Sequence, residues 1–178
     1  MRKELRIVKN GEALTITRSC LETNGEYTQF EGSDEPGVGP PLHVHFKQEE
    51  GLKVLEGRMG VEINGERIEL KAGDEYVFAP GVAHRFWNAG NERLHYSGYV
   101  KPSLNYEYFI EQVYTSANKN RDDKPGVFDA AFLLTRYKSE FDMLVIPKPV
   151  KRIVFPILLF IGKLTGKFKK YRDAPPAL

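Results

Sequence analysis

Two histidines stand one residue apart in the segment PLHVHFKQEEG, and a pair of glutamates follows them. On an extended strand, His43 and His45 point to the same face, about 6 to 7 Å apart along the backbone. Imidazole binds first-row metals such as Fe, Ni, Cu and Zn, and the carboxylate of Glu49 or Glu50 would add an anionic ligand. This segment therefore offers part of a metal site. The two histidines alone are equally compatible with a strand that carries polar surface residues.

A third histidine, His84, lies in KAGDEYVFAPGVAHRFWN, residues 71–88. A Gly-Asp turn leads into one strand, Ala-Pro-Gly ends it, and His84 begins the next. If this strand neighbours the first in a barrel, His84 faces the same interior, and Phe86 and Asn88 share its face. We expect three imidazoles around one point, with Phe86, Asn88 and Glu49 as candidate substrate-pocket residues; for Phe86 the alternative is an ordinary barrel-core side chain.

Short strands separated by turn residues must position these side chains. Strand-like segments recur from about residue 5 to 100, without helical periods between them, and this pattern is typical of a sandwich or a closed antiparallel barrel. The clearest hairpin is VEINGERIEL, because Asn64 and Gly65 tolerate the positive φ angles of a type I′ turn. The sequence therefore predicts a mainly β protein.

Together, the two histidine segments resemble the paired motifs of the cupin superfamily. The first motif (Gly, five residues, His-x-His, three or four residues, Glu, six residues, Gly) is met by Gly37, His43, His45, Glu50 and Gly57. The second motif (Gly, five residues, Pro-x-Gly, two residues, His, three residues, Asn) is met by Gly73, Gly81, His84 and Asn88. Ala79 replaces the motif's proline, with Pro80 one place later, which we expect to alter only the turn before His84.

The resemblance implies an antiparallel cupin-type β-barrel (a jelly roll or double-stranded β-helix) that holds one divalent metal ion, such as Fe, Mn, Ni or Zn. Carried over by position, the ligands are His43, His45, Glu50 and His84. Glu50 is preferred to Glu49 because it keeps the six-residue interval to Gly57, although Glu49 also satisfies the permitted spacing from His45. The implied function is oxygenase-type (dioxygenase) or isomerase chemistry on a small organic molecule; a non-catalytic module that binds or senses a small molecule is the alternative.

Length and composition fit one domain with an appendage. The chain has 178 residues, 41% hydrophobic and 28% charged, and a single cysteine, Cys20, which excludes an internal disulfide and favours a cytoplasmic setting. No apolar run of signal-peptide length is present near the N-terminus, so we expect no export signal.

We predict a barrel over residues 1–102, a helical extension over 103–146 with helical periods through 109–117 and 128–135, and a basic amphipathic tail over 147–178.

The tail differs in charge from the rest of the chain. Residues 148–172 contain eight Lys or Arg and no Asp or Glu, so the formal net charge of +2 leaves −6 for the remainder. The apolar run 153–161 contains Pro156 and is too short to span a bilayer. We favour packing of this run on the barrel or on a second subunit of a homodimer, with peripheral contact of 148–172 with an anionic membrane as the alternative; no nucleic-acid motif is seen.

Overall fold

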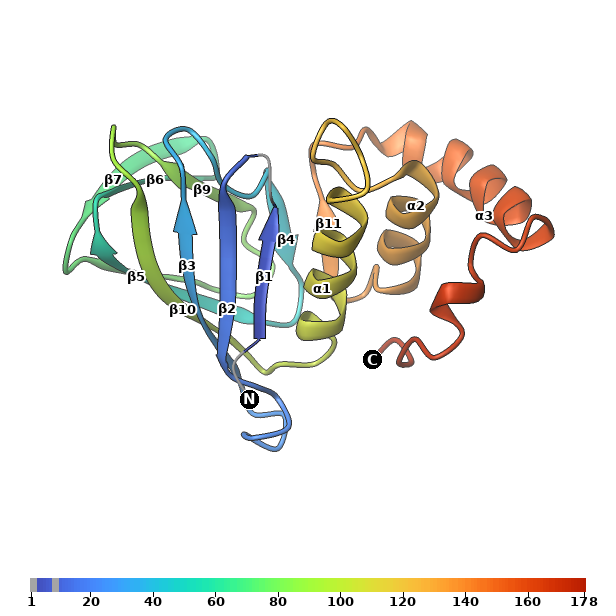
Figure 1. Ribbon diagram of the computed structural model, residues 1–178, viewed down its shortest axis with the longest axis horizontal. Helices are drawn as coiled ribbons and strands as arrows, with labels where there is room; N and C mark the ends of the chain where they lie inside the picture. Colours follow the sequence, from blue (N-terminus) through green and yellow to red (C-terminus); the bar gives the residue numbers. More distant parts are fainter. Residues whose placement is uncertain (1–2, 8–9) are drawn as a thin grey trace.

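The structure is a computed structural model that describes residues 3–7 and 10–178. Two antiparallel sheets form its β half, at the left of Figure 1, and the helices lie on the other side. The six-stranded sheet has the order β1 (Lys3–Ile7), β2 (Glu12–Arg18), β3 (Thr28–Asp34), β10 (Leu94–Lys101), β5 (Glu49–Glu56) and β8 (Glu75–Phe78). The five-stranded sheet has the order β11 (Phe141–Met143), β4 (His43–His45), β9 (His84–Asn88), β6 (Arg58–Ile63) and β7 (Glu66–Lys71).

Alternating side chains build the core between the sheets. Along β10 every second residue from Leu94 to Val100 is buried, and β9 shows the same alternation. Because successive side chains of a strand point to opposite faces, the buried set faces the space between the sheets. The predicted hairpin joins β6 and β7, with φ angles of 52° at Asn64 and 85° at Gly65 as a type I′ turn requires. The predicted mainly β jelly roll with a helical extension is confirmed.

Three α-helices follow the strands: α1 (Tyr106–Ala117), α2 (Val127–Arg136) and α3 (Phe155–Leu164). The first two coincide with the predicted helical periods. The third lies within the apolar run 153–161 and its C-terminal continuation, and it contains Pro156. A turn of π-helix, η1 (Val150–Val154), directly precedes α3, and Pro156 is the second residue of the α-helical part.

The extension also contributes a strand that the sequence analysis did not predict. β11 pairs antiparallel with β4, placing Phe141 opposite His45 and Met143 opposite His43. On the same side of the barrel, the ring of Phe109 in α1 stacks on the ring of Phe141, with centroids 4.6 Å apart. The strand that carries two histidines is therefore held between the barrel and the extension.

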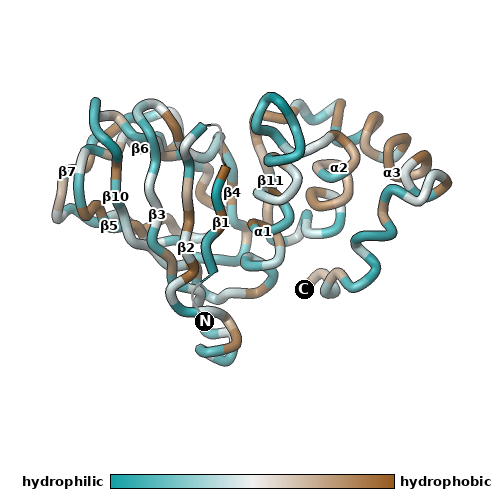
Figure 2. Tube along the Cα trace, viewed as in Figure 1, coloured by the Kyte–Doolittle hydropathy of each residue, from teal (hydrophilic) through white to brown (hydrophobic). Residues whose placement is uncertain are grey.

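The basic tail consists of η1, α3 and a 3₁₀ turn, η2 (Lys169–Tyr171). One side of α3 packs on α2, burying Phe155 and Gly162, and the opposite side is exposed. In Figure 2 the brown, hydrophobic part of α3 lies at the far right, away from the barrel. Within residues 3–7 and 10–178, no helix combines the length and hydropathy that crossing a bilayer requires.

Candidate metal centre

Four ligand-type side chains converge between the two sheets. His43 and His45 come from β4, His84 from the start of β9, and Glu50 from β5 in the opposite sheet. His43 and His84 are directly paired in register, so their rings meet at 4.4 Å between centroids. The four ligand atoms all lie within 4.8 Å of one another. The structure thus brings together the four residues that the resemblance implied.

A single carboxylate oxygen is the centre of this cluster. Glu50 Oε2 lies 2.8 Å from His84 Nε2, 3.6 Å from His45 Nε2 and 3.8 Å from His43 Nε2. Two ligand atoms that each lie about 2.1 Å from a shared ion, at right angles, are about 3 Å apart. The separation between Glu50 and His84 is close to this value, and the other two separations from Glu50 exceed it by less than about 1 Å, so small movements would bring these ligand atoms around one first-row ion.

Backbone carbonyls fix the orientation of two imidazoles. His43 Nδ1 lies 2.8 Å from the carbonyl oxygen of Pro41, and His84 Nδ1 lies 2.8 Å from that of Val82. Because a carbonyl only accepts, each Nδ1 carries the hydrogen, and in the neutral ring the Nε2 lone pair then faces Glu50. A lone pair and a carboxylate oxygen 2.8 Å apart repel each other unless a proton on Nε2, which makes the contact a hydrogen bond, or a metal ion lies between them. This arrangement fits a metal ion.

The electrostatics of the cluster favour the protonation states that ligands need. Burial alone would raise the pKa of Glu50, but hydrogen bonds with His43 and His84 and the charges of His45 and His84 hold that pKa well below its usual range. Burial lowers the pKa of His45 to about 3, against the opposing effect of Glu50. Glu50 is therefore an anion and His45 is neutral near pH 7, as metal binding requires.

Aromatic rings surround the cluster. The ring of Phe78 stacks on His84 with centroids 4.0 Å apart and an interplanar angle of 10°. Phe141 meets the His45 ring edge-on at 5.3 Å, and Tyr106 lies 6.1 Å from it. Sequence reasoning missed these three neighbours: the alternation of β8 was a usable signal for Phe78, whereas Phe141 and Tyr106 reach the site only through the packing of the extension.

Access to the cluster is asymmetric. The side chain of His84 is 1% exposed, Glu50 5%, His45 7% and His43 12%. The aromatic rings cover His84 and His45, so solvent reaches the cluster mainly beside His43. A molecule that approaches the site from outside would meet this imidazole first.

The three other candidate residues lie outside this cluster. Glu49 points away from Glu50 along β5 and accepts a hydrogen bond of 2.6 Å from the hydroxyl of Tyr99. Phe86 is buried in the core, with its ring 5.3 Å from that of Tyr96. Asn88 Nδ2 donates to the carbonyl oxygens of Asp34 and Glu92, which holds the turn after β9. A substrate-pocket role for these three remains a prediction.

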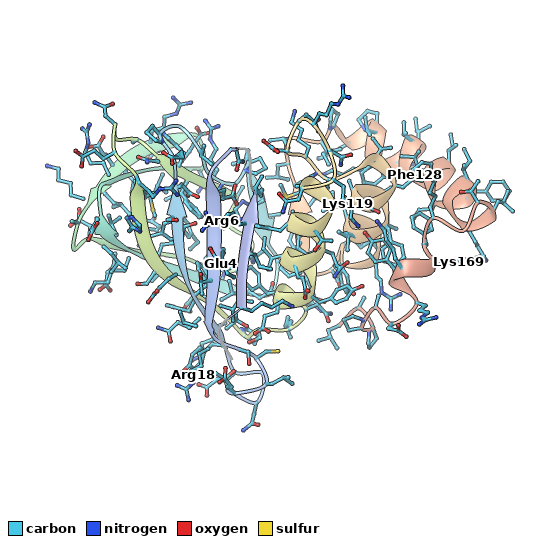
Figure 3. All side chains as sticks on the ribbon, in the orientation of Figure 1. Glu4, Arg6, Arg18, Lys119, Phe128 and Lys169 are labelled. Carbon is cyan, nitrogen blue, oxygen red and sulfur yellow. The ribbon has the colours of Figure 1, made fainter. Side chains whose placement is uncertain are left out.

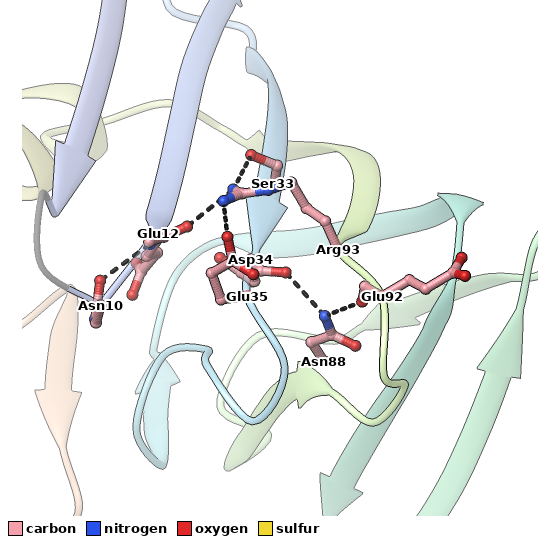
Figure 4. A network of polar contacts seen from close by, with 9 residues as sticks. Asn10, Glu12, Ser33, Asp34, Glu35, Asn88, Glu92 and Arg93 are labelled. Atoms are coloured by element: carbon pink, nitrogen blue, oxygen red, sulfur yellow. Dashed lines mark hydrogen bonds and ion pairs between the residues drawn. The ribbon is translucent and has the colours of Figure 1, made fainter.

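A second group of buried acids lies at the other end of the barrel, near Asn88 (Figure 4). Asp34 has no exposed surface, and its burial, together with the nearby Glu12 carboxylate, raises the pKa of Asp34 to about 8 against smaller opposing effects of Tyr96 and Arg93. Burial also raises the pKa of Glu12, which accepts a hydrogen bond from Tyr114. The carboxyl of Asp34 is therefore protonated near neutral pH.

Comparisons with known proteins agree with this architecture. Residues 31–99 match the family model described as a cupin domain. A structure described as a predicted oxalate decarboxylase from Thermotoga maritima superposes with a TM-score of 0.52 at 21% identity, covering 57% of this chain and 92% of that one. This likeness concerns the fold alone. With the match and the metal-type cluster inside the jelly roll, the chain contains a cupin domain.

Curated relatives match over shorter segments. A probable oxidoreductase of Hypocrea virens is 36% identical over 67 residues, which is 36% of this chain and 31% of the relative. An oxidoreductase of Pestalotiopsis fici is 30% identical over 77 residues, 42% of this chain and 38% of the relative. An epoxidase of Aspergillus terreus is 43% identical over 56 residues, 31% of this chain and 18% of the relative. The matched segments span about a third of the first two relatives.

Proposed function

We propose that the cupin domain binds one divalent first-row metal ion through His43, His45, Glu50 and His84, and that the chain acts there on a small organic molecule. The observation that carries this proposal is the convergence of three Nε2 atoms on Glu50 Oε2, with two Nδ1 atoms held by carbonyls. Side chains that merely filled a core would not need to direct lone pairs at a buried anion.

We further propose oxidoreductase chemistry as the reaction class. The names of relatives from Hypocrea virens, Pestalotiopsis fici and Aspergillus terreus support it, as far as segments of this length allow. A divalent metal bound here would supply a Lewis acid and, with four protein ligands on an ion that accepts six, two open positions. The isomerase alternative uses the same ligands and differs in whether an oxidant is consumed.

This chain's residues have distinct tasks in the proposal. The carbonyls of Pro41 and Val82 hold the His43 and His84 rings in the tautomer that leaves Nε2 free. Phe78 and Phe141 cover His84 and His45 and exclude water from that side. The substrate would enter beside His43, the most exposed of the four, and bind over its ring.

Oxygen uptake by iron-loaded protein tests this function. A panel of small phenols, keto acids and hydroxy acids would be offered to the wild type, His84→Ala and His95→Ala. His95 is the fourth histidine and lies on β10 outside the cluster, so its variant is the matched control. We expect consumption that His95→Ala retains and His84→Ala loses.

Two results would separate the alternatives. Substrate conversion without oxygen uptake, lost in His84→Ala, would favour isomerase chemistry over the oxidoreductase class. Clear ligand-induced thermal shifts with no conversion of any compound would favour a non-catalytic binding module over an enzyme.

A further inference from the structure

The exposed side of α3, with its flanking segments, forms a surface that the metal centre does not explain. We call it the basic apolar face. Its apolar members are large side chains that are 41–72% exposed: Ile153, Val154, Ile157, Phe160, Ile161 and Leu164. Its basic members flank them on both sides: Lys148, Lys151, Arg152, Lys163, Lys167, Lys169, Lys170 and Arg172. No other helix of the described residues exposes a comparable set.

The apolar members form one stripe. Ile157, Phe160, Ile161 and Leu164 follow the spacing i, i+3, i+4, i+7, which places them on one side of an α-helix. Phe155 and Gly162 occupy the opposite side and are buried against α2. The helix is thus apolar on two sides, and only one of them has a partner within the described residues.

The charges around this stripe all have one sign. Residues 148–172 contain no Asp or Glu. Three of the eight cations have acidic partners: Lys151 with Asp142 at 2.5 Å, Lys170 with Asp129 at 2.6 Å and Arg172 with Asp173 at 3.1 Å. For the other five, no ion pair is found among the described residues. The face therefore presents uncompensated positive charge beside exposed hydrocarbon; Figure 3 labels one of the five, Lys169, in the turn after α3.

The segment is held in place at both ends. Before it, β11 is hydrogen-bonded to the barrel strand β4. A side chain at Gly162 would collide with the ring of Phe168, 2.4 Å away, so this glycine lets the following turn fold tightly back. After it, Tyr171 stacks on Phe132 with centroids 4.3 Å apart, and Arg136 donates hydrogen bonds to the carbonyls of Ala174 and Pro175. The basic apolar face therefore belongs to a segment that packs on the rest of the protein at both of its ends.

We propose that the basic apolar face docks on an anionic phospholipid surface, with the apolar stripe entering the headgroup and acyl boundary and the lysines meeting lipid phosphates. A helix with an apolar side and basic flanks is the form that lies in such an interface. The charge pattern argues against a second copy as the occupant, because two-fold pairing through this face would bring two sets of unpaired cations together. This inference is independent of the metal centre.

Sedimentation with vesicles tests the proposal. The vesicles would contain phosphatidylcholine alone or phosphatidylcholine with phosphatidylserine, at low and at high salt. The apolar variant is the triple Ile157→Ser, Phe160→Ser, Leu164→Ser, and its control is Leu21→Ser, an 87% exposed leucine in the turn after β2. The charge variant is the triple Lys163→Gln, Lys167→Gln, Lys169→Gln, and its control removes three exposed lysines of the barrel, Lys53, Lys71 and Lys101, in the same way.

The proposal expects the wild type to sediment with the phosphatidylserine vesicles and not with phosphatidylcholine alone, and high salt to weaken the binding. Both face variants should lose at least about tenfold in partition while both controls keep it, with unchanged circular dichroism. Failure of the wild type to bind anionic vesicles, or equal loss in a face variant and its control, would overturn it. So would a wild-type dimer in solution that the apolar variant converts to a monomer, because a second copy would then cover the face.

Discussion

The two ends of the barrel interior each bury a carboxyl group, and the pKa of that group is shifted in opposite directions at the two ends. Glu50 and Asp34 lie opposite Val100 and Leu94 of β10, which are six residues or about 20 Å apart along the strand. Glu50 is surrounded by three imidazoles, and its pKa is lowered. Asp34 is near another acid, Glu12, and its pKa is raised. The local partners, and not the extent of burial, decide which carboxyl is an anion.

The comparison explains why only one end resembles a metal site. A buried anion is stable only with compensating charge or donors, and the imidazoles of His43, His45 and His84 cluster where a cation can supply it. At the other end, protonation removes the charge instead. Changes at the Glu50 end should therefore affect metal binding, whereas changes at the Asp34 end should affect stability and its pH dependence.

The largest expected effect follows from Glu50→Gln. This change removes the anionic ligand but keeps the side-chain shape, so we expect metal affinity to fall by more than about 100-fold in competition titrations with a chelating dye. The matched control is Glu49→Gln, one residue away on the other face of β5, which should keep wild-type affinity. An equal loss of metal affinity in both variants would contradict the assignment of Glu50 as a metal ligand.

Asp34→Asn should change the pH dependence of folding. Because the folded-state pKa of Asp34 is about 8, above the ordinary value of 3.8, the native protein holds a proton that the unfolded chain releases between these values. The unfolding free energy contributed by Asp34 is therefore full below about pH 4 and falls as pH rises towards 8. The variant cannot titrate and should be more stable than the wild type at pH 8, on the order of a few kcal/mol.

Urea denaturation at pH 4.5, 6 and 8 measures this difference. The gap between Asp34→Asn and the wild type should widen steadily with pH. A constant gap, or a wild type that gains stability relative to the variant as pH rises, would show that Asp34 is ionised in the folded state.

Tyr114→Phe should have a smaller effect at the same end. Glu12 is buried and accepts its hydrogen bond from the Tyr114 hydroxyl, so removing that hydroxyl leaves a buried acid without this donor. We expect a loss of about 1–2 kcal/mol of unfolding free energy with unchanged metal affinity. Tyr27→Phe is the control, because its hydrogen bond with Arg18 is exposed. A change in metal affinity would mean that the two ends are coupled.

The smallest effect is expected from Glu49→Gln on Tyr99. The hydrogen bond with Glu49 is the main cause that raises the pKa of Tyr99 to about 12. Without the carboxylate, this tyrosine should titrate closer to its usual value of about 10, with a change in stability below about 0.5 kcal/mol. NMR of ring-labelled tyrosine, with Tyr99→Phe for assignment, follows the titration. An unchanged pKa would mean that the Tyr99–Glu49 bond does not form.

Local patterns made the barrel and the cluster predictable. Asn64-Gly65 specified a hairpin by its turn conformation, and the period of two in HVH placed His43 and His45 on one face. The choice of Glu50 over Glu49 depended on spacing alone, and strand parity in β5 then separated the two side chains, one towards the histidines and one towards Tyr99.

Features that depend on distant packing were not predictable in the same way. β11 has three residues and no periodic signal, and it forms because the extension returns to β4. Helix α3 contains Pro156 directly after a π-helical turn, and no residue pattern predicted that turn. The acids Glu12 and Asp34 lie far apart in sequence, and only the pairing of β2 with β3 brings them to one end of the barrel.

The ligand sphere of a bound ion tests the central claim most directly. X-ray absorption spectroscopy of protein loaded with one equivalent of zinc should show an ion bound by three imidazoles and one carboxylate. The imidazole signal should fall in His43→Ala and in His84→Ala and stay unchanged in His95→Ala. A spectrum without imidazole ligands, or one that His84→Ala leaves unaltered, would contradict the account.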